Sequence, residues 1–388
     1  MESNLPSTSG EENRRATSKL KRVRIAGFRS LKRVELALGP VTILIGPNGA
    51  GKSNLLGALT MVRMLAFDSL QYFVSRRGGA KFLMHYGPHQ TRIIELGLEF
   101  ETNKGQELAY EARLDFSADN SLQFVEERAG FRHQKDQSWR WHSMGTGHRE
   151  SRLKERAETE RSERGTTART ALWLLRQLNF YHFHDTSINS PLRTFSDPEA
   201  DTFLRSDGDN LASFLLALRD SSDENRRASW KRIQGLVHRV APFVRELQPV
   251  SGRDGVRLDW VDDRGELFGP SHLSDGTLRA IALLTALGQP SDLLPGLTCI
   301  DEPELGLHPA ALAVLCGLIQ SVATRRQVIV STQSPAVLDA FLPRDIVVAE
   351  RKDGATELRR LDEEALASWL EDYSLSELYD KNILGGRP

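Results

Sequence analysis

The chain has 388 residues, which is enough for a large hydrophobic core and about two or three sub-domains. Its 51 Lys and Arg are balanced by 52 Asp and Glu, so no global positive field indicates a nucleic-acid partner, and any such surface must be local. The two cysteines, Cys299 and Cys316, lie in apolar runs, which argues against a disulfide framework. No apolar run reaches the ~20 residues that span a bilayer, and the N-terminus has no apolar signal core, so we expect a cytoplasmic protein without a membrane partner.

The first part of the chain predicts a tail followed by two paired strands. Residues 1–18 are polar and rich in Ser, Thr, Asn and Gly, which is typical of a disordered tail. Residues 21–28 and 31–38 alternate apolar and polar side chains, and the second of these runs ends at a Gly-Pro turn. We therefore expect the two runs to pair as strands ahead of the next segment.

The strongest motif lies between a strand pattern and a helix pattern. The β-branched run 41–45 predicts a buried strand, and an apolar helical pattern begins at Leu55. Between them stands G-x-x-x-x-G-K-S, whose backbone N–H groups cradle phosphates, while Lys52 reaches the β- and γ-phosphates and Ser53 holds Mg²⁺. This context predicts a nucleoside triphosphate site. Its predicted residues are Gly46, Pro47, Asn48, Gly49, Ala50, Gly51, Lys52, Ser53 and Asn54.

Further strand patterns follow at 92–100, 109–116 and 122–127. They predict an antiparallel sheet beside the nucleotide site, and residues 19–127 together form the first expected lobe. Residues 128–250 are expected to be a charged and helical insertion.

The first part of that insertion, 128–169, leaves two interpretations open. Many arginines surround Trp139 and Trp141, and basic residues interleaved with aromatic ones can bind phosphate backbones and stack on bases. Alternatively, this is a mobile insertion with a solvated helix in which Arg and Glu pair at helical spacing. The second interpretation is favoured because mixed charge runs are usually solvated.

Two other clusters have both a metal-binding and a structural interpretation. His182 and His184, with an Asp nearby, could bind a metal by composition, but no further ligand group stands at a recognisable spacing, which favours structural histidines. Asp207 and Asp209 could form a nuclease-like metal pair, but an Asp or Asn directly before an apolar helix is more simply an N-cap. An amphipathic helical region at 224–248 and a hairpin at 250–268 are expected next.

The second expected lobe, 251–350, supplies carboxylates. An L-S-D-G turn opens a helix whose buried stripe begins at Leu278. A short apolar strand then ends in Asp301 and Glu302; Asp301 would bind Mg²⁺ through water, and Glu302 would polarise the attacking water opposite the γ-phosphate. Strands are also predicted at 327–331 and 346–349, and residues 351–388 are expected to be a C-terminal helical tail.

The order of these motifs carries a family resemblance. The phosphate loop, L-S-D-G-T-L-R, I-D-E-P-E-L-G-L-H-P and S-T-Q-S-P together resemble the head domain of ATP-binding-cassette (ABC) proteins. More closely, the chain resembles stand-alone, SMC-like bacterial AAA-type ATPases, including the ATPase halves of overcoming-lysogenization-defect (OLD) nucleases and abortive-infection phage-defence proteins. The resemblance covers residues 19–100 and 270–350. It implies an α/β P-loop NTPase of the ABC head type, with an antiparallel β subdomain and a helical insertion, that uses ATP and Mg²⁺.

The resemblance also implies roles in a head-to-tail homodimer. Ser274, Asp275 and Gly276 of one protomer would cap the γ-phosphate held by the other. Gln333 stands at a switch position that is commonly His in the family, and a Gln cannot take a proton at neutral pH, so hydrolysis is expected to be slow or partner-dependent. For the family's metal-contacting glutamine, position alone suggests Gln71 and Gln90.

The functional expectation is therefore an ATP-hydrolysing, dimerising ATPase with Glu302 and Gln333 as its catalytic residues. Its expected role is that of a sensor or regulator in prokaryotic anti-phage defence or DNA maintenance, acting with a separate effector nuclease, because no nuclease module is evident after residue 350. One alternative is a nucleotide-gated scaffold with little turnover that sequesters a partner. Another is the energising subunit of a transporter. Two features argue against it: S-D-G-T-L-R stands in place of the longer S-G-G-Q motif, and no clear coupling loop is evident.

Overall fold

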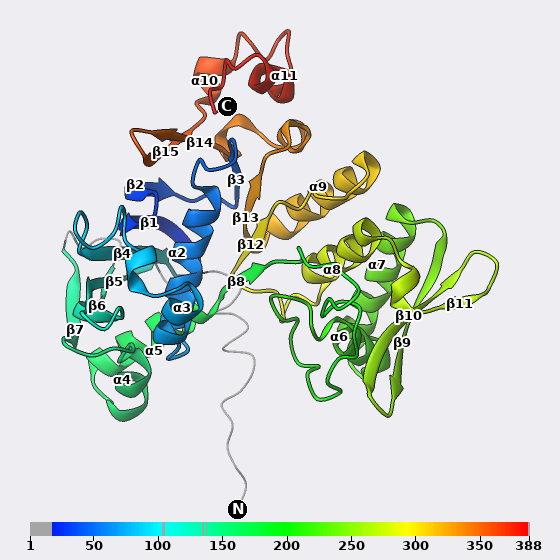
Figure 1. Cartoon of the computed structure of the whole chain (residues 1–388), viewed down its shortest axis with the longest axis horizontal. Helices are drawn as coiled ribbons and strands as arrows, with labels where there is room; N and C mark the ends of the chain where they lie inside the picture. Colours follow the sequence, from blue (N-terminus) through cyan, green and yellow to red (C-terminus); the bar gives the residue numbers. More distant parts are fainter. Residues whose placement is uncertain (1–17, 103–104, 134–135, 137, 387–388) are drawn as a thin grey trace, which may run out of the picture.

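The computed structural model describes residues 18–102, 105–133, 136 and 138–386. The predicted disordered tail, apart from Ser18, lies outside these residues. Figure 1 shows two groups of elements joined through a central sheet, with an antiparallel sheet on one side and a mainly helical group on the other. Among the described residues, none of the helices combines the length and the apolar character that crossing a bilayer requires.

The central sheet has the strand order β15-β14-β3-β13-β12-β8. All of its neighbouring strands run parallel except β15, which is antiparallel to β14. All five residues of β3 are buried, as expected for a parallel strand covered on both faces. The strand bounds are β3 Val41–Ile45, β8 Leu178–Tyr181, β12 Leu297–Asp301, β13 Gln327–Thr332, β14 Ile346–Lys352 and β15 Ala355–Arg360.

The second sheet is antiparallel and has the order β2-β1-β4-β5-β6-β7. Its apolar face packs with helices α2, Lys52–Leu65, and α5, Glu163–Arg176, in one hydrophobic cluster. Its other face carries ion pairs, as expected for a sheet with one solvated face. The strand bounds are β1 Lys19–Phe28, β2 Leu31–Ala37, β4 Ile93–Glu101, β5 Gln106–Phe116, β6 Leu122–His133 and β7 Arg140–Gly145.

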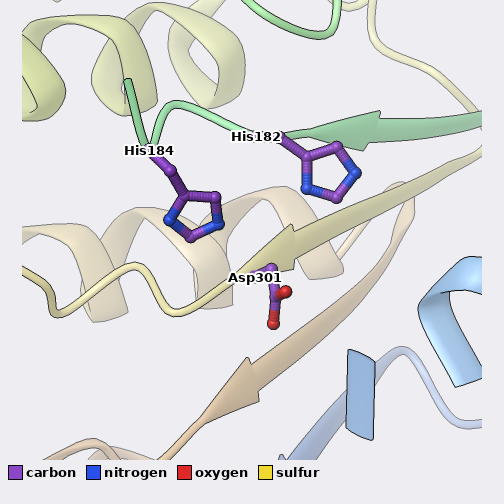
Figure 2. Close-up of side chains that lie close together, drawn as sticks. All are labelled: His182, His184 and Asp301. Atoms are coloured by element: carbon purple, nitrogen blue, oxygen red, sulfur yellow. The ribbon is translucent and has the colours of Figure 1, made fainter. Parts of the chain in front are cut away.

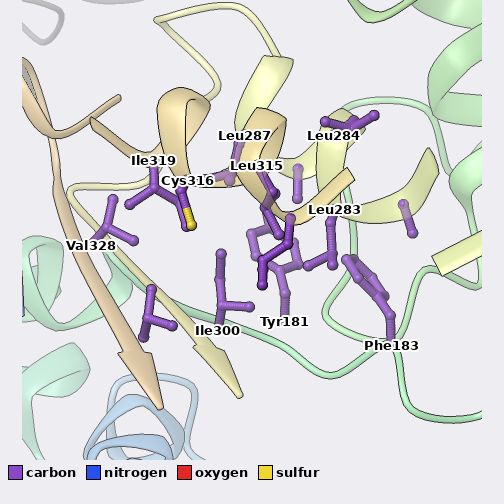
Figure 3. Close-up of a cluster of buried hydrophobic side chains, with 14 of the residues drawn as sticks. Tyr181, Phe183, Leu283, Leu284, Leu287, Ile300, Leu315, Cys316, Ile319 and Val328 are labelled. Atoms are coloured by element: carbon purple, nitrogen blue, oxygen red, sulfur yellow. The ribbon is translucent and has the colours of Figure 1, made fainter. Parts of the chain in front are cut away.

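The helical group lies beyond β8 in Figure 1 and carries a small sheet of order β11-β10-β9. It shares a hydrophobic core with β12 and β13, in which Tyr181, Leu283, Ile300 and Leu315 lie together (Figure 3). This core fixes the helix that begins at the L-S-D-G turn against the strands that carry the carboxylates. The bounds are α6 Leu211–Asp220, α7 Glu224–Val240, α8 Asp275–Gly288, α9 Pro309–Ala323, β9 Val244–Gly252, β10 Gly255–Asp262 and β11 Leu267–Phe268.

Several expected boundaries differ from the structure. The boundary between residues 127 and 128 falls inside β6, and β7 extends the same antiparallel sheet. The stretch 128–250 is also not one insertion, because β8 is the edge strand of the central sheet. The helix expected over 224–248 ends at Val240, and the hairpin that follows begins at Val244 rather than at residue 250.

The C-terminal stretch 351–388 was expected to be helical, but it begins with the hairpin of β14 and β15. Two short helices follow that hairpin. The remaining helices are α3 Leu70–Arg76, α4 Leu153–Thr159, α10 Glu363–Leu366 and α11 Leu375–Asp380, with short 3₁₀ turns at Ala80–Phe82, Pro270–His272, Pro335–Ala340 and Pro343–Asp345.

Candidate nucleotide-binding site

The phosphate loop joins the end of β3 to the start of α2. Gly49 and Gly51 have φ angles of +80° and +104°, a left-handed backbone that favours glycine. A Cβ on Gly51 would also lie 1.9 Å from the hydroxyl oxygen of Thr356, so the close packing excludes larger residues. The loop therefore presents the N-terminus of α2, whose first turn has no acidic residue, as an anion-binding end.

Lys52 lies folded over this loop. Its Nζ donates to the carbonyl oxygens of Gly46, at 2.5 Å, and Pro47, at 3.1 Å. Burial lowers the pKa of Lys52, while the nearby carboxylates of Glu302, Asp301 and Glu304 oppose that shift. Within the part of the chain that the structure describes, the ammonium group is thus held beside the loop by carbonyl oxygens and makes no hydrogen bond to a carboxylate.

Ser53 and Asp301 form the oxygen pair expected to hold Mg²⁺. The Ser53 hydroxyl donates to Oδ2 of Asp301 at 3.2 Å, which joins the start of α2 to the end of β12. Carboxylate and hydroxyl oxygens are ligands that Mg²⁺ accepts. Among the described residues, four buried polar atoms around this edge of the sheet have no hydrogen-bond partner, so the residues present fit a bound ion and phosphates. These atoms are Asp301 Oδ1, Glu304 Oε2, Ser331 Oγ and Arg279 Nε.

Glu302 occupies a constrained position directly after β12. Its φ angle is +45°, which is uncommon for a residue other than glycine and costs about 1–3 kcal/mol unless the surroundings fix it. Its N–H donates to the carbonyl of Ser331 at 2.7 Å, and its carboxylate accepts from the side-chain amide of Gln333. The structure therefore brings the two expected catalytic residues into direct contact.

Glu304 was not among the expected site residues. Its Oε1 accepts from the hydroxyl of Thr332 at 2.7 Å and from the N–H of Gln333 at 2.8 Å. Glu304, in the loop after β12, thereby fixes the backbone of Gln333 at the end of the neighbouring strand β13. In the sequence, Glu304 stands close behind Asp301 and Glu302, which could have marked it as a site residue. The sequence alone does not indicate that it bonds to the segment after β13.

The L-S-D-G turn caps α8 as expected. The Ser274 hydroxyl accepts from the N–H of Thr277 at 3.2 Å, and Asp275 forms an ion pair with Arg193 at 2.7 Å. Gly276 packs so closely that a Cβ there would lie 2.0 Å from the carbonyl oxygen of Gly306, in the loop after β12. In Figure 1, α8 and α2 lie on opposite sides of β8. The helix that this turn opens and the helix that the phosphate loop opens therefore belong to different groups of elements.

Arg279, one turn into α8, is a further residue that sequence reasoning missed. Its Nη2 donates to the carbonyl oxygen of Glu302 at 2.7 Å and contacts Nδ1 of His184 at 3.1 Å. Burial lowers the pKa of Arg279, although three carboxylates of the site act in the opposite direction. Arg279 therefore connects α8, the helix that begins at the L-S-D-G turn, to the loop that carries Glu302.

The two histidines after β8 lie beside Asp301 (Figure 2). One ligand atom from each of His182, His184 and Asp301 lies within 4.8 Å of the others. The sequence did not indicate Asp301 as the third member, because Asp301 ends β12, and only the pairing of β12 with β8 brings it near the histidines. Burial also lowers the pKa of His182, which favours its neutral form.

The two glutamine candidates lie elsewhere. The side-chain amide of Gln71, on α3, donates to the carbonyls of Leu122 and Arg149. Gln90 lies in a turn in which its N–H donates to Gly87. Among the described hydrogen bonds, neither glutamine contacts Asp301. The side chains of His182 and His184 lie beside Asp301 instead.

Two arginines of 128–169 that lie against the tryptophans are paired with glutamates. Arg128 donates through two nitrogens to Glu111, and its guanidinium lies 4.4 Å from the ring centroid of Trp141. Arg132 pairs with Glu107 and lies 4.5 Å from the ring centroid of Trp139. These pairs favour a structural surface over a nucleic-acid site.

The D-G-D stretch before α6 also has a structural role, although not the expected one. Asp209 pairs with Arg205 at 2.8 Å. Asn210 stands at the N-cap, but its side chain bonds to the preceding loop, where its amide donates to the carbonyls of Ala200 and Phe203. The expected side-chain cap is therefore replaced by a loop brace.

Comparison with known proteins gives one family match and several matches in fold. A family model described as "AAA domain, putative AbiEii toxin, Type IV TA system" matches residues 41–339. Over 82 residues, 21% of this chain, the sequence is 37% identical to the OLD nuclease of Thermus scotoductus. That stretch spans 14% of the nuclease.

Among solved structures, an Smc head bound to the C-terminal winged-helix domain of ScpA matches with a TM-score of 0.59 and 15% identity, over 90% of this chain and 99% of that one. An Smc head with an extended coiled coil, bound to the C-terminal domain of ScpA and derived from Pyrococcus furiosus, matches with a TM-score of 0.58 and 15% identity, over 92% and 99%. These likenesses confirm the expected α/β head fold with its antiparallel β subdomain. Because the family model spans most of the chain, including the phosphate loop, Asp301 and Glu302, this chain belongs to that AAA-type family of P-loop ATPases.

Proposed function

We propose that this chain binds ATP with Mg²⁺ at residues 46–54 and hydrolyses it. The observation that carries the proposal is the meeting of three strand ends. Ser53, after β3, contacts Asp301 at the end of β12, and Gln333, after β13, contacts Glu302. Family membership supports the ATPase assignment in general terms.

The binding roles follow from the loop geometry. The phosphates would lie against the N–H groups of residues 46–54 and the N-terminus of α2. Lys52 would exchange the carbonyl oxygens of Gly46 and Pro47 for phosphate oxygens. Mg²⁺, when held by Ser53 and Asp301, neutralises charge on the phosphates.

Glu302 would accept the proton of the attacking water, and Gln333 would hold both the carboxylate and the water in place. The Gln333 amide already donates to the Glu302 carboxylate, and Glu304 fixes the Gln333 backbone. Since Gln333 cannot itself take a proton, we expect slow turnover.

We further propose that two copies pair head to tail around two ATP molecules. The turn of Ser274, Asp275 and Gly276 would then meet the γ-phosphate of the partner at the N-terminus of α8. Asp275 alone would repel a phosphate, but its ion pair with the largely buried Arg193 offsets that charge. The Smc-head fold is consistent with such an arrangement.

For the biological role, we propose a regulatory ATPase of a prokaryotic defence or DNA-maintenance system that acts with a separate effector nuclease. The family description and the partial similarity to an OLD nuclease support this class of role. A second candidate is a nucleotide-gated scaffold with little turnover. The contact between Gln333 and Glu302 favours it, because the Gln333 amide already uses one oxygen of the carboxylate that would accept the proton.

The test compares wild type, Glu302→Gln and Glu364→Gln, an exposed glutamate of α10 that serves as a matched control. Loss of the general base should lower ATP turnover about 10²–10⁴-fold, while ATP binding remains and the ATP-bound dimer accumulates in light scattering. The control variant should match wild type. Wild-type turnover of Glu302→Gln would refute the assigned base, and a monomer at saturating ATP would refute the paired arrangement.

A further inference from the structure

The cluster of His182, His184 and Asp301 adds two imidazoles, which the proposed ATPase chemistry does not use, to the carboxylate of Asp301. The two imidazoles follow β8, the carboxylate ends the neighbouring parallel strand β12, and Figure 2 shows the three side chains grouped together. Their ligand atoms lie within 4.8 Å of one another. Ligands bound at about 2.1 Å to one ion lie roughly 3–4 Å apart, so modest side-chain rotations would close the set.

We propose that His182, His184 and Asp301 bind one transition-metal ion of the Zn²⁺ or Co²⁺ type. Imidazole nitrogen suits these ions, whereas Mg²⁺ prefers a shell of oxygen ligands. Two imidazoles and one carboxylate also make a common three-ligand set that leaves a position open for water or substrate.

An unpartnered atom supports a cation at this point. Oδ1 of Asp301 is buried and has no hydrogen-bond partner among the described residues, while Oδ2 accepts from Ser53. One carboxylate oxygen therefore remains available to an ion, and the other accepts from Ser53 at the start of α2.

Arg279 is the group that the ion must displace. Its Nη2 contacts Nδ1 of His184 at 3.1 Å. If Nδ1 binds the ion, Arg279 loses this acceptor; if Nε2 binds it, Nδ1 must carry the proton and would face a donor. In both cases the contact between Arg279 and His184 breaks, while Arg279 can keep its hydrogen bond to the carbonyl of Glu302.

The shared carboxylate has a consequence that rests on the proposed function. An ion on Asp301 competes for the residue that would also hold Mg²⁺ beside Ser53. Zn²⁺ should therefore inhibit ATP turnover, and raising the Mg²⁺ concentration should relieve the inhibition.

The test is a Co²⁺ titration of the full chain without nucleotide, followed by visible d–d absorption. We expect one Co²⁺ per chain. The double substitution His182→Asn and His184→Asn should weaken binding by more than the roughly 10–100-fold typical of losing an outer-shell partner. Arg279→Gln should tighten binding, because it removes both a competing donor and a positive charge. His89→Asn, in an exposed turn, is the matched control, and thermal melting checks that each variant is folded.

Unchanged Co²⁺ affinity in the folded double histidine variant would overturn the site, as would a wild-type chain that takes up no Co²⁺. Lys52→Ala separates the two proposals, because it should abolish ATP binding and leave the Co²⁺ spectrum intact. Zn²⁺ inhibition that persists in the double histidine variant would overturn the proposed competition through this site.

Discussion

Thr356 braces the phosphate loop from the far end of the chain. Its hydroxyl donates to the carbonyl of Ala50 at 2.8 Å and accepts from the hydroxyl of Ser30 at 2.7 Å. Ser30 in turn accepts from the side-chain amide of Asn54 at 2.7 Å. One chain of hydrogen bonds thus runs from the start of α2, through the turn between β1 and β2, to β15 and back to the loop.

Replacing Thr356 with Val keeps the shape of the side chain but removes both of these hydrogen bonds. Thr356 is only 2% exposed, so water cannot easily replace the lost partner. Leaving a buried polar group without its partner costs about 1–3 kcal/mol. The free loop can relax to regain some of this energy, whereas the nucleotide-bound loop must keep its cradle shape. We therefore expect ATP binding to weaken by about 1.4–2.8 kcal/mol, which is about 10–100-fold.

Calorimetric titration of ATP into wild type, Thr356→Val and Thr356→Ser measures this effect. The serine variant keeps the hydroxyl and should bind ATP within a few-fold of wild type. If the serine variant, which keeps the hydroxyl, weakens binding as much as the valine variant, the loss of the hydrogen bonds would not be the cause. An unchanged ATP affinity in the valine variant would show that the brace does not shape the loop.

Three further predictions concern the rest of the site and the core. Arg279→Met should lower kcat about 10–100-fold with little change in ATP affinity, because it removes a charged hydrogen bond worth about 1.5–3 kcal/mol to the carbonyl of Glu302; steady-state kinetics and titration separate the two quantities. Gly276→Ala should destabilise the chain by about 1–3 kcal/mol in thermal denaturation, because its Cβ would lie 2.0 Å from a backbone oxygen of the loop after β12. Burial raises the pKa of Cys316 to about 11 and raises the pKa of Cys299 further, so both thiols should react with a disulfide reagent at pH 8 only after unfolding; fast reaction of the native chain would contradict their burial.

The sequence predicted those parts of the site that are encoded locally. The phosphate loop combines a strand, a glycine-rich turn and a helix within one short stretch, and the pair Asp301 and Glu302 ends an apolar run. The strands of the antiparallel sheet also carried their own alternating patterns. Each of these features depends on residues that are close in sequence. The alternation of apolar and polar residues, or the spacing of motif residues, was therefore enough to find it.

The missed features depend on contacts between distant segments. β8 is a short strand beside a charged stretch, and only its pairing with β12 makes it part of the central sheet and places His182 near Asp301. Thr356 reaches the phosphate loop from β15, which lies in the stretch 351–388 that was expected to be helical. No local pattern encodes these pairings, because strand order in a parallel sheet is set by how the whole chain packs.

The loop after β12 is where these distant contacts converge. The backbone of Glu302 is held by Ser331 from β13 and by Arg279 from α8, and its carboxylate is held by Gln333. The left-handed backbone at Glu302 costs only about 1–3 kcal/mol, which is comparable to one of these bonds. A displacement of α8, whose first residue follows Ser274, can therefore shift the expected base without unfolding anything else. The geometry thus couples the proposed partner-facing end of α8 to the proposed hydrolytic centre through Arg279.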